Sequence, residues 1–231
     1  MDYLTSPLLD VKHGFFTRNG GVSTGAFASL NVKYDVGDLK SNVNYNRKLI
    51  CQELGQDSKN LVFIKVCHGN KIYEAKSSSP NELSDFDAIV TSQKNLPIGL
   101  SVADCLPIIF QDENSTKIGI AHAGWRGLLN GVIENTINHM GKSNLRAVIG
   151  PSISPSYYEV QSDVASLFSA KYIINQNGKT YLDMWKSAED QLSNLGVKWD
   201  NLKIDTFTDT RFFSYRRENA HTGRFMAIAC L

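Results

Sequence analysis

The sequence predicts a mixed α/β fold (α+β), in which helices cover β-sheets within one compact domain. Strand-like and helix-like stretches alternate along the whole chain, which is the pattern of a sheet with helices packed on it. The chain has 231 residues, of which 42% are hydrophobic, so it is long enough to bury one sizeable core. We therefore expect a single domain over residues 1–231.

The predicted strands are short apolar runs rich in branched residues, several of them bounded by Gly, Pro or Asn. They cover residues 61–66, 98–102, 108–111, 117–121, 146–149, 201–207 and 224–229.

The clearest predicted helix covers residues 128–140, where apolar side chains recur in steps of three and four along one wide face. Weaker helical patterns cover residues 41–54, 158–168 and 182–195. The serine-rich stretch 76–84 is the most linker-like part of the chain, but it is short, so we interpret it as a surface loop inside the domain.

Composition excludes several classes of partner. There are 24 basic and 23 acidic residues, a net charge of +1, so nothing favours nucleic acid or an anionic membrane surface. The first residues lack the pattern of a secretion signal, and no stretch approaches the ~18 apolar residues that cross a bilayer. Four cysteines are too few for a disulfide framework. We expect a cytoplasmic protein that acts on a small neutral or anionic substrate.

Three apolar runs each lead into a turn that carries a potential metal ligand: His68, Cys105 and His122. Two imidazoles and a thiolate suit Zn²⁺, and three protein ligands leave a coordination position open, as catalytic zinc requires. The spacing of the three residues matches no local zinc motif, so ordinary histidines and a cysteine are an alternative. Cys51 and Cys230 are expected in the core, and His139 at a solvated helix end.

The same residues allow a second interpretation that needs no metal. Cys105 would be a nucleophile, His122 its base, and the backbone N–H groups of turn 124–127 an anion hole. Under either scheme Asp104 could orient a histidine or cap a turn.

Arginines in glycine-containing or aromatic-rich turns are candidates for binding phosphate. The alternative is an ordinary surface or ion-paired arginine. Trp125 and Tyr215 offer flat faces for stacking, although aromatic residues beside strands more often belong to the core. The candidate arginines are Arg18, Arg47, Arg126, Arg216 and Arg217.

A series of short motifs, taken in order, resembles one known family. It is the laccase-domain family, once named multicopper polyphenol oxidoreductase and now described as purine nucleoside phosphorylases. The resemblance runs from about His13 to the C-terminus. The motifs are FTRNGGVS (16–23), SLN (29–31), VGD (36–38), NR (46–47), HG (68–69), ADC (103–105), AHAGWRG (121–127), IGP (149–151), YEV (158–160) and FFSYRR (212–217).

The resemblance implies two mixed sheets packed together between helices, and a zinc ion bound by His68, Cys105 and His122. It places Arg47 at the site, as a catalytic residue with the three ligands. The substrate-binding residues expected are Asn31, Arg47, Trp125 and Arg126.

The family is associated with phosphorolysis of adenosine, inosine and 5′-methylthioadenosine and with deamination of adenosine. The expected partners are therefore purine nucleosides and phosphate, and the expected state is a monomer or a weak homo-oligomer. Two positions depart from the family pattern: Val66 stands where a glutamine is common, and Phe207 where a cysteine is common.

Three rival functions remain at this point. A copper-dependent polyphenol oxidase is suggested by the older family name, but only five histidines exist. A metal-free cysteine hydrolase would act on peptidoglycan precursors, since bacterial members are also labelled peptidoglycan editing factors. A non-catalytic partner of cell-wall enzymes is the third.

Overall fold

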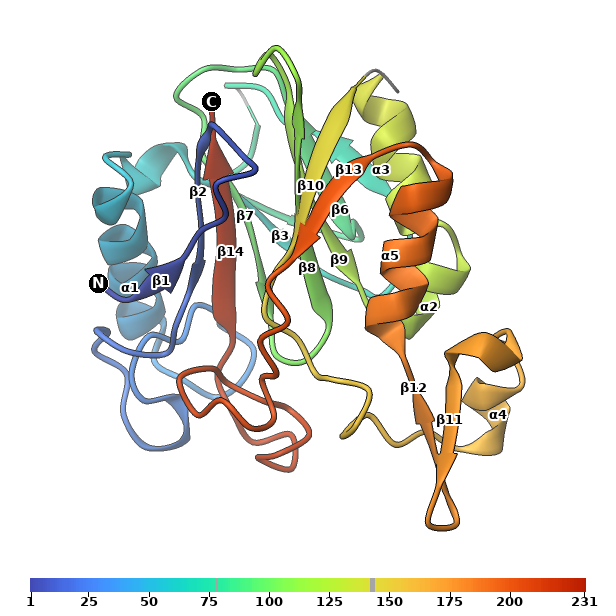
Figure 1. Ribbon diagram of the computed structural model, residues 1–231. Coiled ribbons are helices and arrows are strands. Elements are labelled where there is room, and N and C mark those ends of the chain that lie inside the picture. The colour runs from blue at the N-terminus through green and yellow to red at the C-terminus, as the bar shows by residue number, and fades with distance from the viewer. Residues whose placement is uncertain (78, 142–143) are drawn as a thin grey trace.

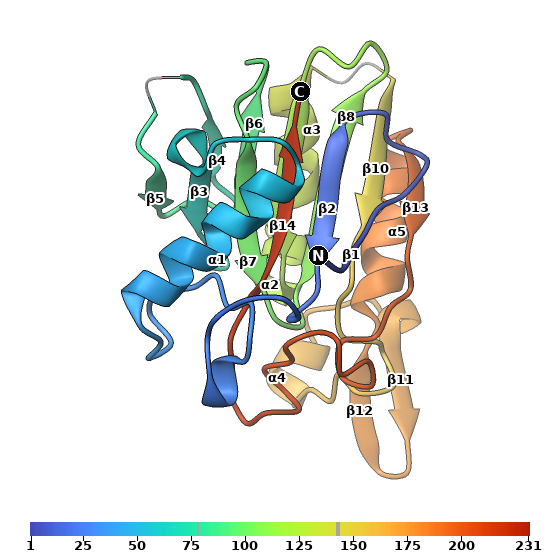
Figure 2. The ribbon, with the colours of Figure 1, turned by 90° about the vertical axis from the view of Figure 1, so that its left-hand side faces the viewer.

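Two six-stranded mixed sheets pack face to face and are enclosed by helices on their outer sides (Figures 1 and 2). The computed structural model describes residues 1–77, 79–141 and 144–231. The predicted fold class is confirmed, including the two packed sheets that the family resemblance implied.

The first sheet consists of β1 (Tyr3–Leu4), β2 (Lys12–Phe16), β3 (Val62–Lys65), β5 (Glu82–Ser84), β7 (Ile98–Val102) and β14 (Phe225–Cys230). Its order is β1-β2-β14-β7-β3-β5. The four strands β1, β2, β14 and β7, adjacent in this order, pair antiparallel with one another. Strand β3 pairs parallel with both β7 and β5. The last strand in sequence, β14, therefore lies inside the sheet, between β2 and β7.

The second sheet consists of β4 (Ile72–Glu74), β6 (Ala88–Thr91), β8 (Leu106–Asp112), β9 (Ile118–Ala123), β10 (Leu145–Ile149) and β13 (Lys198–Asn201). Its order is β13-β10-β8-β9-β6-β4. A separate hairpin of β11 (Ile173–Gln176) and β12 (Lys179–Leu182) projects from the body of the molecule (Figure 1).

Helix α1 (Lys40–Glu53) covers the outer face of the first sheet (Figure 2). The outer face of the second sheet is covered by α2 (Trp125–Leu129), α3 (Val132–Met140) and α5 (Met184–Asn194) (Figure 1). The short helix α4 (Ser162–Ala165) lies beside the projecting hairpin. Single 3₁₀ turns occupy Gly25–Phe27, Ser58–Asn60 and Ala170–Tyr172.

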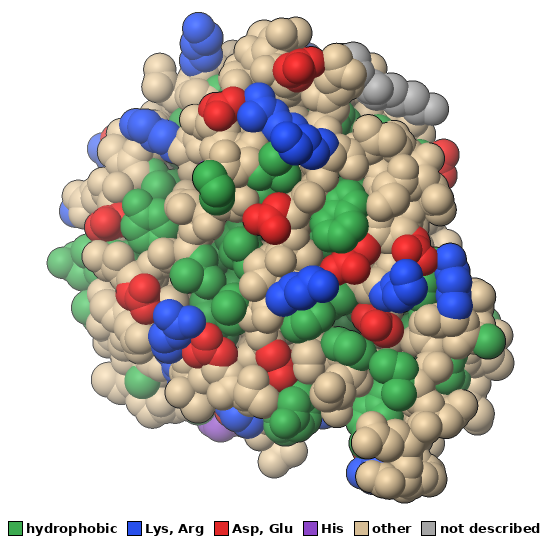
Figure 3. Space-filling view, in the orientation of Figure 1, with side chains coloured by type: hydrophobic (Ala, Val, Ile, Leu, Met, Phe, Trp, Pro, Cys, Tyr) green, Lys and Arg blue, Asp and Glu red, His purple; other side chains and the backbone are tan. Residues whose placement is uncertain are grey.

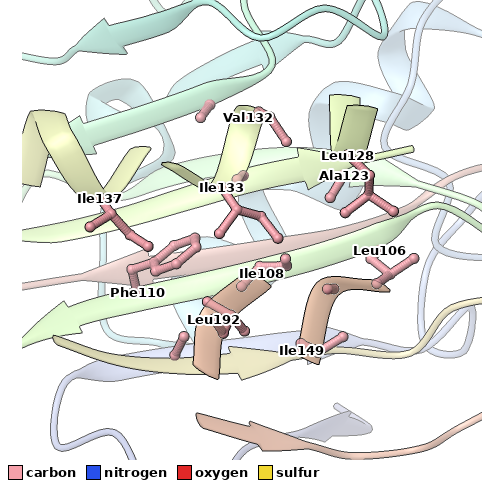
Figure 4. Close-up of a cluster of buried hydrophobic side chains, with 14 of the residues drawn as sticks. Leu106, Ile108, Phe110, Ala123, Leu128, Val132, Ile133, Ile137, Ile149 and Leu192 are labelled. Carbon is pink, nitrogen blue, oxygen red and sulfur yellow. The ribbon is translucent and has the colours of Figure 1, made fainter. Parts of the chain in front are cut away.

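Strand β8 shows why the central strands are continuous apolar runs. Ile108 and Phe110 face the helices, whereas Ile109, between them, faces the first sheet. Successive side chains of a strand point to opposite faces, so the middle of a strand buried on both sides is apolar at every position. The buried Gln111 and Asp112 at the end of β8 are hydrogen-bonded instead. Figure 4 shows Ile108 and Phe110 packed with Ile133 and Ile137 of α3.

The core also contains the two cysteines that were expected there. Cys51 and Cys230 are fully buried, Cys51 in the cluster between α1 and the first sheet. Burial raises the pKa of the Cys51 thiol to about 12 and that of Cys230 to about 11, so both stay protonated and unreactive. His139 lies exposed in the last turn of α3, as predicted.

Two of the predicted helices differ from the structure. The helix expected over 128–140 is interrupted, because Gly131 adopts a left-handed φ of 77° that ends α2 and starts α3. The helix expected over 158–168 is reduced to α4, because the backbone of Tyr158 and Val160 instead pairs with β12.

The predicted strand 201–207 is also wrong beyond its first residue. The side chain of Asn201 accepts a hydrogen bond from the Lys203 N–H, and Lys203 has a φ of 51°, so the strand ends there. In the predicted loop 76–84, residues 82–84 form β5, because they pair parallel with β3. Residue 78 of that loop lies outside the described residues.

Gly150 marks a close contact between the two sheets. It follows β10, and a Cβ placed on it would lie 2.2 Å from the ring of Phe15 on β2. We expect Gly150→Ala to lower the free energy of unfolding by roughly 1–3 kcal/mol, the usual cost of overpacking, measured by urea denaturation. Adding Phe15→Leu should recover part of the loss, and an unchanged stability of the single variant would contradict the contact.

Surface charge is mixed. On the face shown in Figure 3, Lys and Arg side chains are interspersed with Asp and Glu, and no large area of one sign appears there. Among residues 1–77, 79–141 and 144–231, every helix is too short or too polar to span a bilayer.

Candidate metal centre

The two sheets bring His68, Cys105 and His122 together at one edge. Strands β3 and β7 are parallel neighbours, so their carboxyl ends meet, and His68 and Cys105 follow these two strands. His122 lies near the end of β9 in the second sheet. The candidate ligand atoms of the three residues lie within 4.8 Å of one another. The site is therefore built where the two sheets meet.

The geometry of this cluster fits a single metal ion. Cys105 Sγ lies 4.0 Å from His68 Nε2, and the rings of the two histidines meet edge to face with centroids 4.8 Å apart. Zinc bonds of ~2.0–2.3 Å in a tetrahedron place ligand atoms ~3.3–3.8 Å apart. His68, Cys105 and His122 would hold such an ion after a small closure of their side chains, and three protein ligands would leave room for a water or substrate atom.

Asp87, directly before β6, organises the cluster. Its Oδ1 accepts a hydrogen bond from the His68 N–H at 2.8 Å, and lies 2.8 Å from His122 Nδ1. Its Oδ2 accepts from the Gly69 N–H at 2.6 Å and from the Cys67 thiol at 2.9 Å. One carboxylate thus shapes the turn that carries the first histidine and orients the second, leaving Nε2 of His122 for a metal.

Asp87 is fully buried, and it is ionised there. Burial alone would raise the pKa of its carboxyl, but hydrogen bonds from His122 and Cys67 hold that pKa far below its usual range. Asp87 was not among the site residues predicted from the sequence. The available signal was an acidic side chain immediately before the apolar run 88–91.

The Cys105 thiol and the His122 imidazole form a coupled pair. Burial opposes charge on both, but the charge and hydrogen bonding of His122 lower the pKa of Cys105. In turn Cys105 and Asp87 raise the pKa of His122. The thiolate is the form that binds metals and attacks electrophiles, so the site favours the reactive state of Cys105.

Asp104 has a different role from the one predicted. The proposal that it orients a histidine is wrong, because its carboxylate accepts hydrogen bonds from Thr206 Oγ1 at 2.6 Å and from the Arg216 N–H at 2.7 Å. Asp104 therefore joins the turn before Cys105 to the loops around residues 206 and 216, and Asp87 orients the histidine.

Gly124 packs closely against the cluster. A Cβ on it would lie 3.1 Å from Cys105 Sγ and 3.3 Å from His68 Cδ2. A side chain at this position would therefore push the sulfur of Cys105 and the ring of His68 outward by a few tenths of an ångström.

A cavity of about 350 Å³ opens beside the cluster. This lies within the range of roughly 300–1,000 Å³ that is usual for small-molecule sites. Two of the predicted substrate-binding residues, Trp125 and Arg126, line it, and so do Tyr158 and Tyr215. Arg126 lies 4.2 Å from the Trp125 ring centroid. The cavity therefore combines flat aromatic faces with positive charge.

The other two predicted site residues, Asn31 and Arg47, do not line this cavity. Arg47 is buried in α1, where it donates to the Val32 carbonyl at 2.9 Å, pairs with Glu82 at 2.6 Å and lies over the Phe63 ring. Asn31 is fully buried. Both contact the backbone next to the cavity wall.

The remaining arginines divide into two groups. Arg216 lines the cavity, and its Nη1 donates to the carbonyls of Tyr157 and Glu159. Arg18 and Arg217 instead each form an ion pair with Glu218 and do not line the cavity.

The two departures from the family pattern lie in different places. Val66 is part of the cavity wall, so this chain has an apolar surface where a glutamine is common. Phe207 stacks on Tyr157 at 4.5 Å outside the cavity. The Val66 departure thus changes the cavity wall, and the Phe207 departure changes packing outside the cavity.

Similar proteins cover nearly the whole chain. A Deinococcus radiodurans protein named purine nucleoside phosphorylase is 33% identical over 97% of this chain and 91% of its own length. The Escherichia coli protein named purine nucleoside phosphorylase YfiH is 34% identical over 93% of this chain and 91% of its own length.

Solved structures share the fold. A crystal structure of a Neisseria meningitidis protein superposes with a TM-score of 0.91 at 33% identity, covering 100% of this chain and 99% of that one. A Bacillus licheniformis protein described as hypothetical protein YfiH gives a TM-score of 0.89 at 30% identity, covering 96% and 92%. The sequence profile described as multi-copper polyphenol oxidoreductase laccase matches residues 12–231. The chain belongs to this laccase-like family, several of whose members are named purine nucleoside phosphorylases.

Proposed function

We propose that this chain is a zinc-dependent purine nucleoside phosphorylase that acts on adenosine, inosine and 5′-methylthioadenosine. The observation that carries the proposal is the cluster of His68, Cys105 and His122 opening into a cavity with aromatic and cationic walls. The names of its relatives support the reaction class.

The cavity residues have chemistry that suits a purine nucleoside. Trp125, Tyr158 and Tyr215 offer aromatic surface for a flat base. Arg126 offers a donor group beside that surface, where negative charge develops on a departing purine. Asp87 holds the His122 ring in place, so the site is preorganised.

The donor set of two nitrogens and one sulfur favours zinc over a multicopper arrangement, which usually needs more histidines. A bound zinc would supply Lewis acidity and a water whose pKa is ~7. We propose hydrolytic deamination of adenosine as an accessory activity of the same site.

In this proposal Asn31 and Arg47 act by holding backbone groups of residues 32 and 33, beside the cavity. Arg47 holds the Val32 carbonyl, and the Asn31 side chain holds the N–H of Lys33. Both are therefore proposed as positioning residues for the cavity wall, in place of the direct substrate contacts expected from the resemblance.

The test is product analysis of the purified protein with adenosine, with and without inorganic phosphate. We expect adenine and ribose 1-phosphate only when phosphate is present, and inosine in both cases. Activity should be lost on chelation and restored by zinc in preference to copper. If no adenine, ribose 1-phosphate or inosine forms with zinc-loaded protein, the proposal fails.

A second candidate is a metal-free cysteine hydrolase that acts on peptidoglycan precursors, and the coupling of Cys105 to His122 favours it. It predicts hydrolysis that persists in chelator and is stopped by iodoacetamide. Activity that is lost in chelator would support the phosphorylase over the hydrolase. So would protection of Cys105 from alkylation when zinc is bound.

A further inference from the structure

Lys33 and Arg224 are two cationic residues of the cavity wall. Both line the cavity that Cys105 and His122 also line. In residues 1–77, 79–141 and 144–231, neither forms an ion pair, whereas Arg18, Arg47 and the neighbouring Lys65 each pair with a carboxylate.

A fully buried side chain holds the two cationic residues together. Oδ1 of Asn31 accepts from the Lys33 N–H at 3.1 Å and from the Arg224 N–H at 2.9 Å. Its Nδ2 donates to the Lys33 carbonyl at 3.0 Å and to Asp38 Oδ2 at 2.8 Å. The Val32 N–H donates to the Arg224 carbonyl at 3.1 Å. Segments almost two hundred residues apart in sequence are thereby fixed side by side.

The positive charges of Lys33 and Arg224 repel each other. Burial, followed by the charge of Arg224, lowers the pKa of Lys33. Burial also lowers the pKa of Arg224, against the attraction of Asp104 and Cys105. Like charges held together in a half-buried wall are stabilised when an anion binds between them.

Hydrogen bonds from one of its nitrogens hold the Arg224 guanidinium in place. Its Nη1 donates to the carbonyls of Thr222 and Gly223, both at 2.9 Å, and its Cζ lies 5.3 Å from the Tyr215 ring centroid. Among the described residues, Nε and Nη2 of Arg224 and Nζ of Lys33 have no hydrogen-bond acceptor. These donors suit an acceptor with several oxygens.

We propose that Lys33 and Arg224 form a subsite for a phosphate group, and that its occupant is the inorganic phosphate consumed in phosphorolysis. The assignment rests on the proposed function. A phosphate oxygen forms a bond to C1′ of the ribose while the C1′–N9 bond breaks, and the electron pair of that bond leaves with the purine. The proton of hydrogen phosphate balances the one gained by the purine. The two cations hold the phosphate for this displacement.

The experiment compares Lys33→Gln, Arg224→Gln and Arg224→Lys in the zinc-loaded protein. Binding of inorganic phosphate is measured by calorimetry, and the KM for phosphate by product formation at saturating adenosine. The matched control is Lys65→Gln, which removes a nearby positive charge that is paired with Asp35 and does not line the cavity.

We expect each glutamine variant to weaken phosphate binding at least about tenfold, because each loses charge-assisted hydrogen bonds. Arg224→Lys should recover part of the loss, and the control should stay within about twofold of the parent. Zinc content and the Kd for adenosine should be unchanged in all variants. An unchanged phosphate KM and Kd in both glutamine variants would overturn the subsite.

A titration with adenosine 5′-monophosphate separates the two sources of a phosphate group. If the variants weaken binding of the nucleotide and leave that of inorganic phosphate unchanged, the assignment to inorganic phosphate is wrong. If the parent protein performs no phosphorolysis but binds phosphate through Lys33 and Arg224, the proposed function fails and the subsite stands.

Discussion

Replacement of Cys105 by alanine is expected to remove bound metal and to reduce turnover by about 10³-fold or more. The thiolate is one of only three protein ligands in the cluster, and two imidazoles alone bind zinc weakly. Electrostatic and metal contributions at a reacting centre commonly reach several kcal/mol, and each 1.36 kcal/mol is tenfold in rate.

The measurement combines elemental analysis of the purified variant with its rate on adenosine and phosphate. Cys67→Ser is the matched control, because Cys67 is an exposed cysteine beside the cluster but not part of the ligand set. The control should keep its metal and most of its activity. A Cys105→Ala protein with full zinc content and full activity would place the active site elsewhere.

Asp87→Asn is expected to lower the affinity for zinc by roughly 10–100-fold, the usual effect of removing a carboxylate that orients a ligating histidine. The carboxylate accepts hydrogen bonds from the turn of His68 and contacts His122 at Nδ1. An amide cannot accept from all of these groups at once, because its nitrogen is a donor. Both histidines should therefore lose their alignment.

Zinc affinity can be measured by competition with a chromophoric chelator. Asp85→Asn is the control, since Asp85 is an exposed aspartate two residues away whose left-handed φ of 68° asparagine tolerates. The control should bind zinc as the parent does. Equal affinity of the Asp87→Asn variant and the parent would show that Asp87 only supports the fold of the turn.

The sequence was sufficient for the class of fold because the buried strands carry an unmistakable pattern. Strands β7 and β14 are short runs made up almost entirely of apolar residues, and both were predicted nearly to the residue. The helix interruption at Gly131 was not predicted, because an isolated glycine is compatible with a helical pattern as well as with a break. Strand β5 was missed because its pairing with β3 depends on tertiary contact, which local sequence does not contain.

At the site, the candidate ligands at strand ends were found from the sequence, whereas the aspartate that organises them was not. His68, Cys105 and His122 follow apolar runs, so the sequence indicated them. Asp87 was missed because its partners lie in separate turns and no spacing rule connects them. Asn31 was predicted from its motif to bind substrate, but it does not line the cavity, and its contact with Arg224 depends on a chain crossing that only the folded structure shows.

The interior position of β14 has a consequence for biosynthesis. Strand β7, which leads to Cys105, pairs directly with this last strand, and the first sheet is divided in two without it. A growing polypeptide therefore has all three metal ligands well before it has the strand that completes the sheet behind them. Metal capture should accordingly await the pairing of β14, so that a chain without this strand carries its histidines and its thiol but no stable place for the ion.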